Sequence, residues 1–215
     1  MKRIFMAAAI MVAGVFAGNA QSLSYKVEAG ANFSDFDTKV LGSTKDVSKI
    51  IVGYRAGVGM EVNLSDNLYF SPYLMFKMNG AKADSKVEIA GRKTLDFKTT
   101  LHYLAMPLNL GFRSGITDNL AVAVEFGPYV AYGLKGTHSI AGIDFDAFKS
   151  DKKAELFEGG VKRFDWGLNG AVALEYTNFY FKLGADYGLY NIMKEGNKDN
   201  SFKNIAFYTN VGYRF

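Results

Sequence analysis

Alternation of apolar with polar or small residues at every second position is the feature that most limits how this chain of 215 residues can fold. In 179–190 the odd positions are Phe, Phe, Leu, Ala, Tyr and Leu, and the even positions are Tyr, Lys, Gly, Asp, Gly and Tyr. Because successive side chains of a strand point to opposite faces, such a segment predicts a β-strand with one apolar face. The same pattern predicts strands over 23–34, 53–64, 68–79, 103–113, 120–133, 164–177 and 204–215.

The connections between these segments alternate in length. The short ones are 65–67, 114–119 and 177–178, and the long ones are about 35–52, 80–102, 134–163 and 191–203. Outer-membrane barrels alternate short periplasmic turns with longer extracellular loops in this way. The sequence therefore predicts an all-β fold, a transmembrane antiparallel up-and-down β-barrel of about eight strands.

The N-terminus has the composition of a secretory signal. Two basic residues, Lys2 and Arg3, precede an apolar run over 4–17 and small residues at 18–20. The run is shorter than the roughly twenty residues of a membrane anchor. We therefore expect a cleaved signal peptide over 1–20 and a single outer-membrane β-barrel domain over 21–215. The sequence contains no cysteine, which excludes disulfides and a cysteine-linked lipid anchor.

Side-chain volume decides which face of the barrel points inward. A soluble barrel with an apolar interior would show the same alternation. Here the apolar set holds bulky residues such as Trp166 and Phe181, whereas the opposite set is rich in small ones such as Gly57 and Ala123. The interior of an eight-stranded barrel is just wide enough for packed side chains. We therefore expect the bulky set to face lipid and the small set to line the lumen.

Charged residues of both signs share the parity of the small set. Buried charges need partners, so we expect a paired network that fills the lumen; an ion path through the same charges is the alternative. The network is predicted to comprise Lys26, Glu28, Arg55, Glu61, Lys77, Arg113, Glu125, Asp165, Glu175, Lys182, Asp186 and Arg214.

Three segments resemble a known family: YLAMPLNLGFR at 103–113, RFDWGLNGAVALEY at 163–176 and NIAFYTNVGYRF at 204–215. They are similar to the bacterial outer-membrane protein β-barrel domain family, often labelled porin family, of the small eight-stranded type. The resemblance implies an integral location in the outer membrane of a Gram-negative cell envelope. It also implies that the last strand, through Tyr213 and Phe215, is read by the outer-membrane assembly machinery. It indicates almost nothing about activity, since the label porin need not mean a conducting pore.

The residues offer little catalytic chemistry. His102 and His138 are the only histidines, and neither shows the spacing of a nucleophile, a base and an orienting group. The acidic residues Asp151, Glu155 and Glu158 lack the pattern of a calcium loop. We therefore expect no enzyme, no catalytic residue, no cofactor and no metal. A lipid-modifying enzyme that uses His102 at the outer rim remains the least favoured alternative.

The expected function is an integral scaffold with a side-chain-filled lumen and four surface loops, in an envelope-structural or adhesion and recognition role. In the longest loop, Phe145, Phe148 and Phe157 form the expected contact surface. The alternative is a narrow porin-like channel for small solutes or ions. Expected partners are outer-membrane lipid, lipopolysaccharide and the assembly machinery, and the protein is expected to be monomeric with an unspecified extracellular ligand. A net charge of +4 without a basic stripe argues against nucleic acid.

Overall fold

The computed structural model describes residues 23–40, 43–44, 48–83, 97–140, 143–149, 160–194 and 201–215. The predicted signal peptide over 1–20, Phe157 and the acidic residues Asp151, Glu155 and Glu158 lie outside these ranges. In the described ranges, no helix has both the length and the apolar character needed to cross a membrane.

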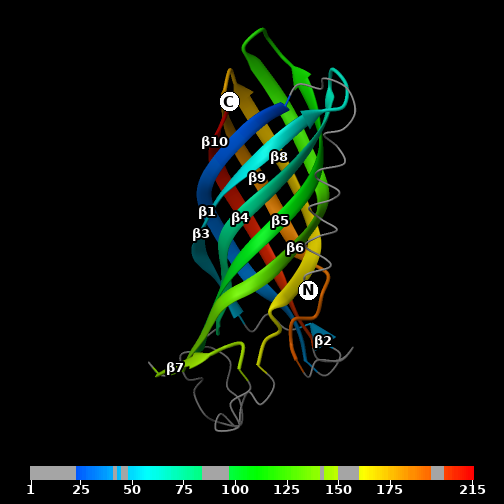
Figure 1. Cartoon of the computed structure of the whole chain (residues 1–215). Coiled ribbons are helices and arrows are strands. Elements are labelled where there is room, and N and C mark those ends of the chain that lie inside the picture. Colours follow the sequence, from blue (N-terminus) through cyan, green and yellow to red (C-terminus); the bar gives the residue numbers. More distant parts are fainter. Residues whose placement is uncertain are drawn as a thin grey trace.

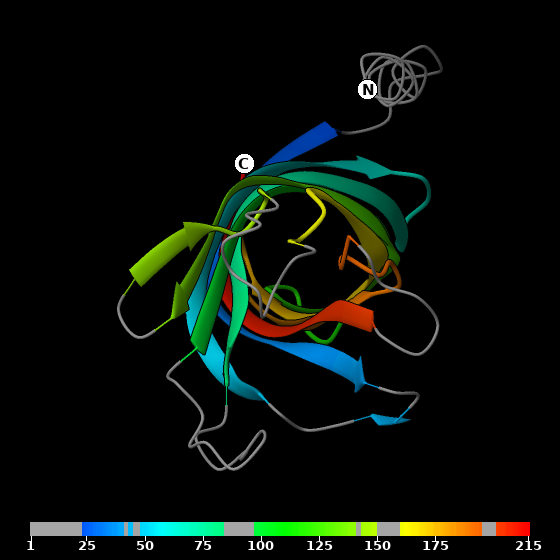
Figure 2. The same cartoon turned by 90° about the horizontal axis from the view of Figure 1, so that it is seen from below.

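Eight long antiparallel strands form a closed barrel, which confirms the predicted fold (Figures 1 and 2). Around the ring the order is β1, β3, β4, β5, β6, β8, β9 and β10, and β10 pairs with β1 from Lys26↔Arg214 to Lys39↔Ser201. The bounds are β1 Leu23–Val40, β3 Ser48–Asn63, β4 Leu68–Ala83, β5 Phe97–Gly115, β6 Leu120–Ile140, β8 Phe164–Tyr176, β9 Phe179–Gly188 and β10 Ser201–Arg214. Two short strands, β2 (Ser43–Thr44) and β7 (Ile143–Asp146), pair with β1 and β6.

The two ends of the barrel differ in their connections. Tight turns over 64–67, 116–119 and 177–178 lie at one end, together with the C-terminus (Figure 1). The strand ends that the long connections join lie at the other end, where β2 and β7 project beyond the ring. We call these the turn end and the loop end. The alternation of short and long connections that the sequence predicts is therefore present.

Several strands run further toward the loop end than predicted. β1 continues to Val40 where the sequence indicated 34, β5 begins at Phe97 where it indicated 103, and β6 continues to Ile140 where it indicated 133. Outward positions in these extensions include Thr100 and Thr137, which are polar. Alternation disappears from the sequence there, although the backbone ladder continues.

The outward face carries the bulky apolar side chains, as predicted. Along β8 the exposed residues include Trp166 (41%), Val172 (52%) and Leu174 (49%), whereas Asn169 (1%) and Ala173 (3%) between them are buried. The described core therefore lies inside the cylinder, and the apolar exterior suits contact with lipid.

The lumen differs from the prediction in one respect, because tyrosines occupy it as well as small and charged residues. Tyr69, Tyr73, Tyr103, Tyr129, Tyr180 and Tyr208 are all buried. Each lies directly opposite a glycine of a neighbouring strand: Tyr69↔Gly111, Tyr73↔Gly59, Tyr103↔Gly133, Tyr129↔Gly167, Tyr180↔Gly212 and Tyr208↔Gly184. At Gly111, Gly184 and Gly212 an added Cβ would overlap the opposing ring. The missing side chains therefore let the rings lie against the barrel wall.

Candidate functional site

The predicted lumen charges form a continuous ionic network at the turn end and the middle of the barrel. Lys26 Nζ lies 2.6 Å from Glu61 and 3.3 Å from Glu125. Lys182 Nζ lies 2.9 Å from both Glu28 and Glu125. Near the turn end, two arginines complete the network: Arg113 lies 2.7 Å from both Glu61 and Glu175, and Arg214 lies 3.0 Å from Glu175 and 3.5 Å from Glu61. Four cations and four carboxylates thus neutralise one another.

A second, smaller ionic group lies nearer the loop end. Asp186 on β9 accepts from Lys77 at 2.7 Å and from Arg55 at 3.2 Å. Asp165 on β8 accepts from the phenol of Tyr129 at 3.1 Å and from Asn204 Nδ2 at 2.9 Å. All twelve predicted charges therefore point into the lumen, eleven of them in ion pairs and Asp165 among neutral donors.

Several of these contacts cross the full diameter of the barrel. In the ring of eight, β1 faces β6, β4 faces β9, and β5 faces β10. Lys26 of β1 contacts Glu125 of β6, and Lys77 of β4 contacts Asp186 of β9. Lys182 of β9 also donates to the Tyr73 hydroxyl of β4 at 3.0 Å. Side chains from opposite walls thus meet at more than one level along the axis.

Tyrosine rings pack against the lumen cations. Lys182 Nζ lies 4.4 Å from the centre of the Tyr73 ring, Lys77 Nζ lies 4.5 Å from that of Tyr129, and the Arg55 guanidinium lies 3.5 Å from that of Tyr208. Desolvated cation–π contacts contribute up to about 2 kcal/mol each. The sequence analysis missed these residues, because only the strand register reveals that each tyrosine faces a glycine.

An apolar core lies inside the barrel toward the loop end. It contains Leu101 and Tyr103 of β5 together with three residues from the connections, Phe148, Val161 and Ile192. Phe148 is only 5% exposed and packs beneath the guanidinium of Arg163. Its predicted place on a loop contact surface is therefore wrong, because the chain after β7 turns inward and buries this ring.

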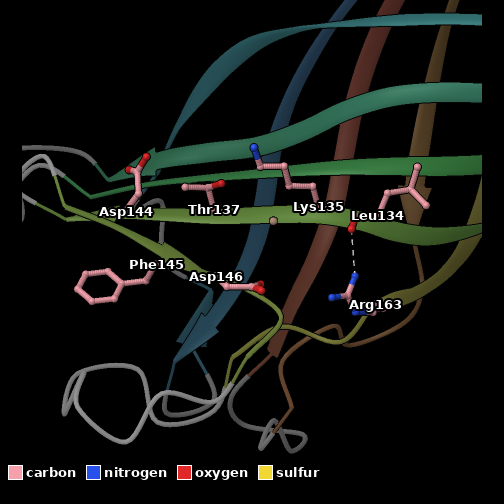
Figure 3. A pocket seen from close by; sticks show the side chains of 8 residues that line it. Leu134, Lys135, Thr137, Asp144, Phe145, Asp146 and Arg163 are labelled. Atoms are coloured by element: carbon pink, nitrogen blue, oxygen red, sulfur yellow. Dashed lines mark hydrogen bonds between the residues drawn. The ribbon is translucent and has the colours of Figure 1, made fainter.

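Beside this core, β6, β7 and Arg163 enclose a surface pocket of about 330 Å³ (Figure 3). Arg163, just before β8, donates to the carbonyl oxygens of Gly133 and Leu134 at 2.8 and 3.1 Å, which ties the start of β8 to β6. Phe145 of β7 is partly exposed and extends away from Arg163 in Figure 3. Of the predicted contact residues in the described chain, Phe145 is thus the one on the surface.

The two histidines lie apart from each other, and each contacts a hydroxyl. His102 Nδ1 lies 3.1 Å from the Tyr54 hydroxyl, and its ring stacks on Phe76 with centres 6.2 Å apart. His138 Nδ1 lies 2.9 Å from Thr99 Oγ1, a residue that is only 2% exposed. Burial lowers the pKa of His138, which lies beyond the membrane-spanning part of β6, to about 4. The described chain contains no cluster of histidine and carboxylate side chains that could hold a metal ion.

The predicted assembly signal lies at the turn end. Phe215 is 66% exposed, and the Tyr213 ring contacts those of Phe215 and Phe179 with centres 4.8 and 4.9 Å apart. These aromatic side chains form an outward-facing cluster where the barrel closes. Whether the assembly machinery reads them stays a prediction.

A closed barrel with a bulky apolar exterior and an ionic interior defines an integral outer-membrane β-barrel protein. Residues 19–194 match the family described as "Outer membrane protein beta-barrel domain". The chain belongs to this family and is located in the outer membrane, as the sequence analysis predicted.

Solved structures of other outer-membrane proteins are similar to this chain. OprG from Pseudomonas aeruginosa is 15% identical, with 92% of this chain and 98% of that chain covered and a TM-score of 0.48. Ail, the attachment invasion locus protein of Yersinia pestis, is 14% identical, with coverages of 90% and 99% and a TM-score of 0.44. A major outer membrane protein from Thermus thermophilus is 17% identical, with coverages of 90% and 100% and a TM-score of 0.46. No curated protein matches the chain.

Proposed function

We propose that this protein is a non-conducting, non-enzymatic scaffold of the outer membrane that presents its loop-end surface for adhesion or recognition. The observation that carries the proposal is the set of contacts across the barrel diameter. Lys26 with Glu125 and Lys77 with Asp186 join opposite walls through side chains that are each about 2% exposed. A continuous water path would have to break these pairs, and the desolvated ions would then lose their partners at a cost of several kcal/mol each.

The surroundings of the histidines support the non-enzymatic part of the proposal. His102 stands among the outward aromatic rings of Tyr54 and Phe76. The Thr99 hydroxyl next to His138 is buried, so a lipid acyl group has no route to it as a nucleophile. Mass spectrometry of lipopolysaccharide from cells that carry His102→Ala or His138→Ala should therefore give the wild-type pattern, and a changed acylation pattern would contradict the proposal.

Single-channel recording in planar bilayers tests the closed lumen. The wild-type protein should give no steady openings at any holding potential. Steady openings whose conductance changes with Glu61→Gln or Arg113→Gln would instead establish the narrow channel, because both residues belong to the ionic network at the turn end. Lys203→Gln, on the outside of the barrel, is the matched control and should have no effect on any current.

A further inference from the structure

A histidine and a lysine lie side by side on the outer wall of the barrel, toward the loop end. Strand register places His102 of β5 directly opposite Lys135 of β6. Their chain neighbours Leu101 and Gly136 are buried, whereas Lys135 is exposed and His102 partly exposed, so both side chains point outward. Directly opposite residues have Cβ atoms about 5 Å apart. The two side chains can therefore contact one ligand from outside the barrel.

A bulge in β6 aims the lysine outward. The register pairs Tyr103 with Gly133 and His102 with Lys135, so Leu134 is an extra residue without a partner on β5. Before this point the outward residues of β6 have even numbers, and beyond it they have odd numbers. In a regular strand, position 135 would point into the barrel. Bulges that re-aim a side chain are frequent next to functional sites.

The outer surface of β5 and β6 changes from apolar to polar at this pair. Toward the middle of the barrel, the next outward residues that face each other are Leu104 and Tyr132. Toward the loop end they are Thr100 and Thr137. Tyrosine side chains favour the boundary between hydrocarbon and water. The histidine and the lysine therefore lie at the level of the lipid headgroups.

Two aromatic residues hold the imidazole of His102 in place. The Tyr54 hydroxyl lies 3.1 Å from Nδ1, and the Phe76 ring stacks on the imidazole with an angle of 15° between the planes. A neutral imidazole has one N–H donor and one acceptor, so a phenol that donates to Nδ1 leaves the donor at Nε2. Tyr54 and Phe76 thus define the orientation of the ring and the nitrogen that can donate to a ligand.

The ammonium group of Lys135 has no ion-pair partner in the described part of the chain. Asp144 and Asp146 of β7 line the same surface pocket, but neither forms an ion pair with Lys135, whose side chain extends away from Asp146 in Figure 3. Asp146 accepts instead from the backbone N–H of Phe148 at 2.9 Å. A lysine at the membrane surface attracts anionic headgroups. Its charge therefore favours an anion as the ligand.

We propose that His102 and Lys135 bind a phosphate group of an outer-leaflet lipid. His102 Nε2 donates one hydrogen bond to a phosphate oxygen, and Lys135 Nζ donates a second, charged one. Tyr54 is a positioning residue, because it acts through the imidazole. The acyl chains lie against the apolar wall next to Leu104 and Tyr132. This binding role for His102 is independent of whether the lumen conducts.

Native mass spectrometry of the detergent-solubilised protein, titrated with diphosphorylated lipid A and with lipid A stripped of both phosphates, tests this site. Lys135→Gln should weaken binding of the diphosphorylated lipid about fivefold. His102→Phe, which keeps an aromatic ring against Phe76, should weaken it about tenfold, and the double variant should weaken it more than either. Lys135→Arg should preserve binding. Lys203→Gln, on β10 at the far side of the barrel, should leave binding unchanged, and heat-modifiable migration on gels verifies that each variant is folded.

The Tyr54→Phe variant tests the positioning role separately. In ¹⁵N NMR spectra of the wild-type protein, the His102 ring should have its proton on Nε2, and the Nε2 resonance should shift when the diphosphorylated lipid binds. Tyr54→Phe should transfer part of the proton population to Nδ1 and weaken binding about threefold. A wild-type ring with its proton on Nδ1 would contradict the role of Tyr54.

Three results would overturn the site. One is equal affinity of the wild-type protein and the double variant for the diphosphorylated lipid. Another is equal binding of both lipids to the wild-type protein, which would show that the acyl chains alone drive association. The third is displacement of the lipid by inorganic phosphate at the same concentration, which would assign the two residues to a free anion.

Discussion

Replacing Lys182 with methionine removes the cation that joins three walls of the lumen. Its Nζ contacts Glu28, Glu125 and the Tyr73 hydroxyl at 2.9, 2.9 and 3.0 Å, and the side chain is 3% exposed. Removing one partner of a buried ion pair costs about 3–5 kcal/mol. Glu125 keeps Lys26 and Tyr69 as donors, and Glu28 keeps Tyr180 and Asn210. We therefore expect a loss at the lower end of that range, about 3 kcal/mol in the free energy of unfolding.

Urea unfolding in lipid vesicles measures this loss, with the single tryptophan, Trp166, as a fluorescent reporter of contact with lipid. The matched control is Lys203→Met on the outer surface, which should cost less than about 1 kcal/mol. Adding Glu125→Gln to Lys182→Met restores neutrality of the ionic network. The double variant should therefore be more stable than the sum of the single effects predicts, by at least about 1 kcal/mol. If Lys182→Met costs no more than Lys203→Met, the lumen is hydrated and the closed-lumen account is wrong.

Further variants test the packing of the lumen and the loop end. Gly111→Ala should destabilise the barrel by about 1–3 kcal/mol in the same assay, because its Cβ would overlap the Tyr69 ring. Gly170→Ala, whose Cβ would lie 3.6 Å from the nearest atom, should change stability little, and equal effects would refute the glycine–tyrosine packing. Phe148→Ala should lower the free energy of unfolding by about 3–5 kcal/mol, whereas Phe145→Ala should change it by no more than about 0.5 kcal/mol. A larger loss for Phe145→Ala than for Phe148→Ala would show that Phe148 lies on the surface. In NMR spectra of micelles, His138 should titrate near pH 4, well below the ordinary value of 6.5, and a midpoint at 6.5 would show that it is hydrated. Because its pKa is depressed in the fold, the stability it contributes is complete above pH 6.5 and is lost as the pH falls from 6.5 toward 4.

The membrane-spanning strands could be predicted from the sequence because lipid demands an apolar outer face. Predicted strands over 164–177 and 179–190 correspond to β8 (Phe164–Tyr176) and β9 (Phe179–Gly188) within two residues. The loop-end extensions could not be predicted, because their outward positions, such as Thr100 and Thr137, are polar and the apolar outer face that marks the membrane-spanning strands is missing there. The prolines show a related limit. Proline cannot donate to a strand ladder and would favour bulges at Pro72, Pro107 and Pro128. The register is nevertheless unchanged across all three, and it shifts between Ile50 and Arg55 and between His102 and Tyr103.

The sequence also predicts which charged residues line the lumen, because the alternation along each strand assigns every residue to one face. Their partners could not be predicted, since Lys26 and Glu125 are 99 residues apart and meet only once the barrel closes. The same holds for the tyrosines, whose glycine partners are defined by strand register.

The central claim is that bulky side chains face lipid while the lumen is packed and dry. Magnetisation transfer from lipid acyl chains to side-chain methyl groups, recorded by NMR in nanodiscs, tests it without any substitution. The structure predicts transfer to Val58, Leu74 and Leu183, which are 49–56% exposed on the outer wall, and none to Met75, Leu101 and Ala173 inside. Strong transfer to the second group with none to the first would contradict it.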